Sequence, residues 1–145
     1  MDNFVTKLMD VLHKHDIHCM FNKRDEIVYS LYKSVYGEVF NLYNKEENEI
    51  TTYAIFSHPI SNIRKQAVLD YITDLDTGKY EGCFFIDEST NCVAYEVSYR
   101  LKSEMDYTES SHFEDFCVTT QVMFEKHLAE LYRLITNKSF TPEFD

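Results

Sequence analysis

Glycine and proline are scarce in this chain of 145 residues, which contains 3 glycines and 2 prolines. Average usage would give about 17 of these two residues together. Glycine-rich loops that bind phosphate groups and long flexible linkers both depend on them, so neither is expected here. The length fits one domain, which we expect over residues 1–138, with a short tail over 139–145.

Positive charge is scarce as well, because 14 Lys and Arg residues face 25 Asp and Glu residues, for a formal net charge of −11. The basic residues are scattered singly or in pairs such as Lys23-Arg24 and Arg64-Lys65. Nucleic-acid binding needs many basic side chains on one face. We therefore expect no nucleic-acid partner.

Long hydrophobic runs are missing too. No apolar stretch approaches the roughly 20 residues that span a bilayer, so we expect no membrane association. The first 15 residues contain Asp2 and Asp10 and lack the apolar block of a secretory signal. The sequence therefore predicts a cytoplasmic protein.

The four cysteines lie far apart and form no C-x-x-C pair. Without a signal peptide or a very small core there is no reason to expect disulfides, so we interpret all four as reduced thiols. A turn centred near Ser89 would pair Ile86 with Cys92 and place Cys83 opposite Tyr95. The cysteines are Cys19, Cys83, Cys92 and Cys117.

What the chain has in quantity is apolar and aromatic residues, with 44% hydrophobic residues, 11 Tyr and 11 Phe. Apolar residues three or four positions apart predict a first helix from Phe4 to His15. Apolar residues at every second position then predict half-buried strands. These strands are expected over 27–31, 35–42 and 50–56, with a shorter one possible over 17–21.

The second half repeats this alternation of patterns. A helix over 63–75, capped by Ser61 or Asn62 and ended by Gly78, is followed by two strands over 83–87 and 93–101. An acidic loop over 103–115 and a long helix over 111–137 complete the chain. The predicted fold is α+β, with an antiparallel sheet of about five strands, helices on one face and the order α-β-β-β-α-β-β-α.

The densest cluster of potential metal ligands is His13, His15, His18 and Cys19. On a helix His13 and His15 would point about 200° apart, whereas zinc ligands normally return to one face. We therefore favour a polar helix end over a zinc site. The sequence predicts no metal or other cofactor.

Two further groups contain residue types that occur in chemical sites. His127 and Cys117 share one side of the last helix, but ten residues of helix separate them by about 15 Å, too far for a nucleophile and its base. The carboxylates Glu104, Asp106 and Glu109 lack the spacing of a calcium loop, so a solvated loop is favoured. No catalytic signature is found, and we do not expect an enzyme.

Two predicted helices have more apolar surface than packing on one face of a sheet would bury, and this surface supplies candidates for binding. The helix over 63–75 has an apolar face about 180° wide, and the last helix has a second apolar stripe opposite its main one. We consider a dimer or client surface and plain burial as alternatives for these residues. The candidates are Tyr71, Ile72, Leu75, Val118, Val122, Ala129 and Tyr132.

Tyrosines in the predicted strands also allow two interpretations. Aromatic pairs across strands stabilise a sheet by about 0.2–1 kcal/mol each, whereas tyrosine is also enriched at binding faces. We favour sheet packing for any one residue, and expect some to reach the surface. They are Tyr29, Tyr32, Tyr36, Tyr43, Tyr53, Tyr95 and Tyr99.

The order of elements resembles the type III secretion chaperone-like fold, and within it the stretch QAVLDYITDLDTGKYEGCFFIDESTNCVAYEVSYRL is similar to the YbjN family. The match includes Gly82-Cys83-Phe84 at a strand start and the strand from Val93 to Leu101. The segment from Ile72 to Asp76 stands where that family has an Ile/Leu-Asn-x-Leu-Asn box, although neither Asn is present here.

The resemblance implies a bacterial, cytoplasmic, non-enzymatic protein-binding module, either chaperone-like or regulatory, that forms a homodimer and binds a protein client or regulatory partner. An exposed strand edge could add a client strand through backbone hydrogen bonds. The alternative is a small-ligand sensor or an enzyme with a pocket between the sheet and the long C-terminal helix. A structural or antitoxin-like acidic partner is a third possibility, supported by charge alone.

Overall fold

The computed structural model describes residues 3–75, 80–100 and 111–138. The predicted helix stop at Gly78, the acidic segment with Glu104, Asp106 and Glu109, and the tail over 139–145 lie outside these ranges. In chain order the elements are α1 (Asn3–Lys14), β1 (Cys19–Asn22), β2 (Ile27–Ser34), β3 (Gly37–Glu46), β4 (Glu49–Phe56), α2 (Asn62–Thr73), β5 (Cys83–Asp87), β6 (Cys92–Arg100), α3 (Ser111–Cys117) and α4 (Thr119–Thr136).

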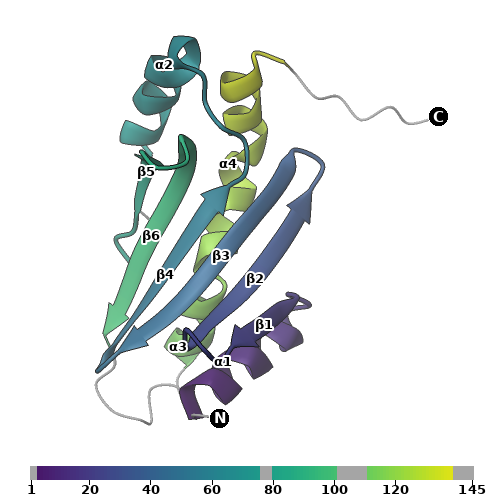
Figure 1. Cartoon of the computed structure of the whole chain (residues 1–145), viewed down its shortest axis with the longest axis vertical. Coiled ribbons are helices and arrows are strands. Elements are labelled where there is room, and N and C mark those ends of the chain that lie inside the picture. Colours follow the sequence, from purple (N-terminus) through teal and green to yellow (C-terminus); the bar gives the residue numbers. More distant parts are fainter. Residues whose placement is uncertain (1–2, 76–79, 101–110, 139–145) are drawn as a thin grey trace, which may run out of the picture.

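The strands form one sheet in the order β1-β2-β3-β4-β6-β5, and all neighbours are antiparallel (Figure 1). The predicted α+β class and antiparallel sheet are therefore confirmed. The sheet has six strands rather than about five. The difference is β1 (Cys19–Asn22), which overlaps the short strand considered over 17–21 and forms because its residues pair with the first half of β2.

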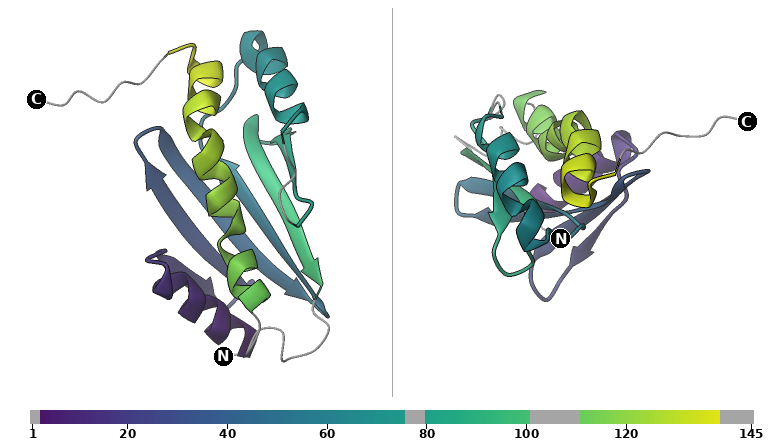
Figure 2. Two further views of the ribbon diagram at one scale, coloured as in Figure 1. Left: turned by 180° about the vertical axis from the view of Figure 1, so that it is seen from behind. Right: turned by 90° about the horizontal axis from the view of Figure 1, so that it is seen from above.

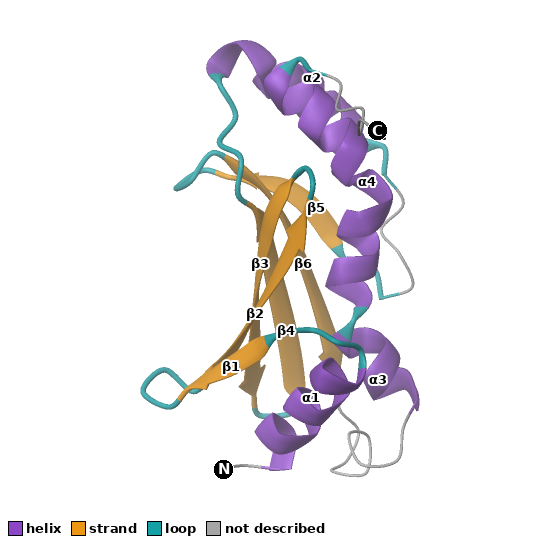
Figure 3. Cartoon of the chain, turned by 90° about the vertical axis from the view of Figure 1, so that its right-hand side faces the viewer, coloured by secondary structure: helices purple, strands orange, loops and turns teal. Residues whose placement is uncertain are grey.

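The helices cover one face of the sheet, and the opposite face carries none of the described helices (Figure 3). Seen from behind, α4 crosses the strands, with α1 near its lower end and α2 beside its upper end (Figure 2). None of the described helices is long and apolar enough to cross a membrane.

The core lies between these helices and the covered face of the sheet. Alternate residues of each strand point into it, because successive side chains of a strand point to opposite faces. Buried strand residues include Val28, Val39, Tyr43, Ile50, Ala54, Phe56, Phe84, Val93, Tyr95 and Val97, and buried helix residues include Phe4, Leu8, Leu12, Val68, Phe113, Phe116, Phe124, Leu128 and Leu131.

The long C-terminal helix predicted over 111–137 is broken at Val118, which separates α3 from α4. The hydroxyl of Tyr43 donates a hydrogen bond to the carbonyl of Cys117 (2.8 Å), and the amide of Asn41 donates to the hydroxyl of Thr120. Buried polar groups of the sheet thus bind the helical segment where it breaks. Its apolar pattern continues through the break, which is why the sequence predicted one helix.

The hairpin of β5 and β6 also differs from the prediction. Ile86 pairs with Val93, Cys92 pairs with Asp87, and Cys83 lies opposite Glu96. The turn closes one residue later than expected, because Asp87 accepts hydrogen bonds from the amide and hydroxyl of Ser89. The shift places Cys83 on the open face.

Gly82 precedes β5 at a point where no side chain fits. A Cβ atom there would lie 2.1 Å from the hydroxyl oxygen of Tyr95, whose ring packs on Phe84 with centroids 4.7 Å apart. The close approach of Tyr95 therefore accounts for glycine at this position.

Candidate interaction surfaces

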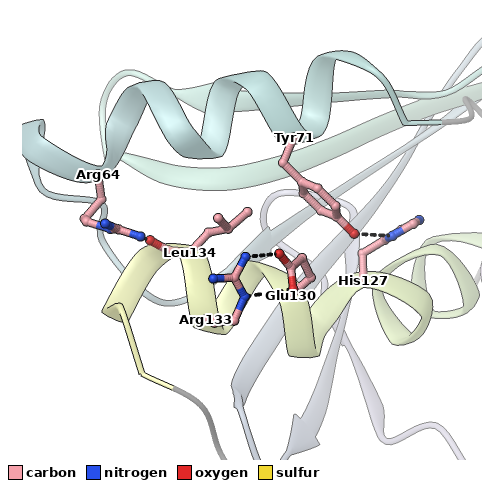
Figure 4. A network of polar contacts seen from close by, with 6 residues as sticks. All are labelled: Arg64, Tyr71, His127, Glu130, Arg133 and Leu134. Atoms are coloured by element: carbon pink, nitrogen blue, oxygen red, sulfur yellow. Dashed lines mark hydrogen bonds and ion pairs between the residues drawn. The ribbon is translucent and has the colours of Figure 1, made fainter.

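The α2 candidates Tyr71, Ile72 and Leu75 contribute to packing within the chain. Ile72 is buried, with 5% of its surface exposed, and Leu75 is half-buried against the core. The Tyr71 hydroxyl lies 2.8 Å from Nδ1 of His127 on α4 (Figure 4). These residues help to join α2 to α4.

The α4 candidates separate into packed and outward-facing residues. Tyr132 packs against the rings of Tyr36 and His58, with centroids 5.8 and 5.6 Å apart. Val122 is 43% exposed, and Ala129 is also exposed. Val118, at the helix break, is half-buried. The structure thus does not bring the seven predicted residues together into one exposed surface.

The contact between α2 and α4 also carries polar groups. Arg64 donates from Nε to the carbonyl of Leu134 near the end of α4 (2.7 Å; Figure 4). Burial, followed by the nearby charge of Lys126, lowers the pKa of His127. His127 packs against Tyr71 and Phe84, and both contacts are edge-on. The imidazole of His127 therefore serves packing and shares a hydrogen bond with the Tyr71 hydroxyl through Nδ1.

The cysteines are free thiols in this structure, and Cys117 is almost fully buried. Burial is the main cause that raises the pKa of the Cys117 thiol, followed by the charge of Glu114. A nucleophilic cysteine needs the opposite shift. Cys117 therefore belongs to the core.

The histidine cluster near the end of α1 is divided among different contacts. His13 Nε2 lies 3.5 Å from the sulfur of Cys19, whereas His15 Nε2 lies 3.1 Å from a carboxylate oxygen of Glu114. Lys14 also pairs with Glu114, at 2.9 Å. Within residues 3–75, 80–100 and 111–138, no group of three or more His, Cys, Asp or Glu side chains is placed to hold a metal ion.

The open face of the sheet carries an apolar surface that the sequence did not single out. These apolar residues form two adjacent rows that run across the strands. The first row has one residue each from β2, β3, β4, β6 and β5, and the second has one each from β1, β2, β3 and β4. We call these residues the open-face band. The first row is Leu31, Phe40, Ile55, Ala94 and Phe85, and the second is Met20, Tyr29, Leu42 and Tyr53.

Exposure within the open-face band is highest at Met20 (61%) and Phe40 (43%). Phe40 packs against Tyr29 with ring centroids 5.6 Å apart, so neighbouring aromatic residues shield one another. The predicted cross-strand pairing of Tyr29 is thus present on a face that no described helix covers. The missed signal was alternation itself, since Phe40 and Leu42 are apolar between the buried Val39, Asn41 and Tyr43.

A cleft of about 830 Å³ lies beside this band, at the edge of β2. The pairing of β1 with β2 ends at Cys19 and Ser30, and the amide of Leu31 still donates to the carbonyl of His18 (3.4 Å). Backbone groups alternate in direction along a strand. The amide and carbonyl of Lys33, two residues after Leu31, therefore point to the same side as the Leu31 amide, away from β3. No described strand pairs with Tyr32–Ser34 on this side.

The walls of this edge cleft come from three parts of the fold. The segment between α1 and β1 forms one wall, α4 contributes Gln121, and the sheet provides the floor. The lining residues are His15, Asp16, Ile17, His18, Cys19, Met20, Tyr29, Ser30, Leu31, Tyr32, Lys33, Phe40 and Gln121.

In comparisons with models of protein families and with curated proteins, the chain matches none of them. The similarity to YbjN proteins and to type III secretion chaperones therefore stays a prediction.

Proposed function

We propose that this protein is a non-enzymatic, cytoplasmic protein-binding module, chaperone-like or regulatory, that binds an extended segment of a partner protein along the free edge of β2. The observation that carries the proposal is the edge cleft, where strand pairing stops although β2 continues to Ser34. An edge strand with unpaired backbone groups can accept one more strand.

Backbone geometry defines how such a segment would bind. The outward amide and carbonyl of Lys33, beyond the last β1 pair, would make the first new hydrogen bonds. The segment would therefore extend the line of β1 toward the hairpin that joins β2 to β3. The three unpaired positions of Tyr32–Ser34 allow only a short strand, so side-chain contacts must contribute to affinity.

Side chains on the two sides of β2 indicate which residue types the partner segment would carry. On the open side, Met20, Leu31 and Phe40 form an apolar wall, which favours an apolar anchor. On the covered side, Tyr32 and Gln121 offer polar groups. An extended partner would satisfy both by alternating apolar and polar residues, because its side chains also point to opposite faces.

Charge favours a partner segment that is neutral or basic. The chain has a net charge of −11, which attracts basic proteins over several ångströms and repels acidic ones. The resemblance to secretion chaperones, which hold an extended segment of a client, supports the same mode of binding. A homodimer is part of the proposal.

The test exploits the outward direction of the Lys33 amide. Lys33→Pro removes this donor without breaking a β2–β3 hydrogen bond, whereas the control Lys33→Ala removes only the side chain. Each immobilised protein would be incubated with native cytosol, the retained proteins identified by mass spectrometry, and their segments titrated as synthetic peptides. We expect Lys33→Ala to retain the partner and Lys33→Pro to weaken peptide binding at least tenfold.

Hydrogen exchange gives a second measurement on the same complexes. The bound peptide should slow exchange of the Lys33 amide and leave the amides of α2 unchanged. Equal peptide affinity of the wild type and Lys33→Pro, or protection that appears only on α2, would refute binding along this edge.

A small ligand is the second candidate for the same cleft, because its volume of about 830 Å³ lies in the usual range for small-molecule sites. Ser30, Tyr32 and Gln121 are polar residues that line it. A ligand held by side chains would raise the thermal midpoint of the wild type and of Lys33→Pro equally. A partner strand would instead raise the thermal midpoint of the wild type more than that of Lys33→Pro.

A further inference from the structure

We infer that the open-face band is the interface through which two copies of this chain stack sheet against sheet. The inference goes beyond the proposed function, since the partner segment binds along the backbone edge of β2 while the band joins two identical chains. Met20, Tyr29, Leu31 and Phe40 belong to both surfaces, as the wall of the cleft and as part of the band. It also assigns the predicted homodimer to the sheet, rather than to the candidate residues of α2 and α4.

The first support is the composition of the face. In the two rows of the open-face band and their continuation on β5 and β6, Glu96 is the charged residue, and it lies toward the β5 side. Charged and polar residues stand in the rows beyond, such as Lys33 and Glu38 above the band and Asn44 and Thr51 below it. An apolar centre with a polar rim is the composition of a protein interface.

The second support is size. Six strands about 4.8 Å apart span about 24 Å, and eight residues at about 3.3 Å each span about 26 Å. The face therefore measures roughly 600 Å² in projection, which is of the same order as the roughly 800 Å² per partner of a stable interface. A single extended peptide, about 5 Å wide, would leave most of the band in water. A second sheet covers all of it.

The third support is that the band is complementary to itself. A two-fold axis parallel to the strands, between β3 and β4, brings β3 over β4 and β2 over β6 of the second copy. Phe40 then faces Ile55 at the same level, and Leu31 lies over Ala94, a small residue that its neighbours already bury. Aligned sheets normally pack at about 30° to one another, with side chains interdigitating.

Charges at the rim near the β2–β3 hairpin agree with this axis. Lys33 comes opposite Cys92 of the second copy, next to Asp87, which pairs with that cysteine. Glu96 comes opposite Tyr29 rather than another carboxylate, and Glu38 comes over the end of β4. The axis thus brings Lys33 toward a carboxylate at one rim. At the opposite rim it places Glu46 over Glu49 of the second copy, beside Arg100, which pairs with Glu49.

The test compares two substitutions that start from the same exposure. Phe40 and Val122 are each 43% exposed, one in the open-face band and the other on the outer side of α4. We expect light scattering to give twice the 17.2 kDa chain mass for the wild type and for Val122→Arg. Phe40→Arg should raise the dimer dissociation constant at least 100-fold. Circular dichroism would verify that both variants fold.

A pair of complementary variants tests the axis and keeps the result independent of folding losses. Phe40→Lys and Ile55→Asp should each be monomeric alone, and mixing them should restore a dimer with one chain of each kind. Recovery on mixing requires that position 40 of one copy faces position 55 of the other. Failure of the mixture to dimerise, although both variants are folded, would refute this arrangement.

Other outcomes overturn the inference directly. A monomeric wild type at millimolar concentration, or dissociation by Val122→Arg while Phe40→Arg stays dimeric, would exclude the open-face band as the interface. Peptide binding to the β2 edge is measured separately, so a monomer that still binds its partner would refute this inference alone. A dimer that binds no partner would instead refute the proposed function.

Discussion

The two faces of the sheet make an instructive comparison, and β4 shows it most clearly. Ile50, Ala54 and Phe56 are buried on the covered face, while Tyr53 and Ile55, between them, lie on the open face and stay half-buried. A strand that is apolar on both sides is typical of a sheet covered on both sides. The comparison teaches that the open face has the composition of an interior surface without the cover of a helix.

Apolar side chains stabilise a fold when they are buried. Truncating a phenylalanine should therefore cost far more stability on the covered face than on the open face, and this is the largest effect that we expect. Phe124 of α4 is fully buried against the covered face, and Phe124→Ala should lower the free energy of unfolding by about 3–5 kcal/mol. Phe40→Ala on the open face should cost about 1 kcal/mol or less in the monomer. Urea denaturation at low protein concentration measures both, and similar losses would contradict the comparison.

Removing a single tyrosine hydroxyl group from each face gives a second, smaller comparison of their stability. The buried Tyr43 donates to the carbonyl of Cys117 at the helix break, and Tyr43→Phe leaves this carbonyl unsatisfied. We expect a loss of about 1–3 kcal/mol, measured by urea denaturation. The matched change Tyr29→Phe on the open face should alter stability by less than about 0.5 kcal/mol. A larger loss for Tyr29→Phe would show that the open-face band is not accessible to water.

The smallest expected effect concerns Asp87, whose carboxylate accepts hydrogen bonds from Ser89 and from the hydroxyl of Tyr53 on the open face. The Ser89 hydroxyl first, and then the Tyr53 hydroxyl, lower the pKa of Asp87 from 3.8 to about 2. Because the folded pKa is the lower one, this stabilisation is complete above about pH 4 and is lost as the pH falls to about 2.

Tyr53→Phe should therefore raise the pKa of Asp87 and reduce the loss of stability between pH 4 and pH 2. An NMR titration of the Asp87 carboxyl carbon measures the pKa directly, with Tyr29→Phe as the control that leaves it unchanged. An unaltered titration in Tyr53→Phe would mean that Ser89 alone holds the carboxylate.

Local patterns in the sequence predicted most of the elements, because periodicity depends on neighbouring residues. The strands from Ile27 to Phe56, the hairpin of β5 and β6, and the helices at both ends all agree with the periods of 2 and 3.6. The break at Val118 could not be predicted in this way. At the break, the carbonyl of Cys117 accepts a hydrogen bond from Tyr43, which lies 74 residues earlier in the chain. The residues near the break do not indicate this contact.

The candidate site was less predictable than the fold. The outward position of Val122 agrees with its predicted stripe, whereas Ile72 proved to be buried between helices. The edge cleft depends on where β1 stops pairing with β2, which is a matter of register. A turn that closes one residue late, as at Asp87, likewise changes which residues share a face.

By itself, the sequence determined the α+β class, the order of its elements and the alternation of side chains along each strand, since these follow from backbone geometry and local hydrophobicity. Only the tertiary structure decided which of the two apolar faces is covered. Packing of α1, α3 and α4 on one side depends on contacts between residues far apart in the chain. Phe40 and Phe56 are both phenylalanines in predicted strands, and the position of the helices makes one exposed and the other buried.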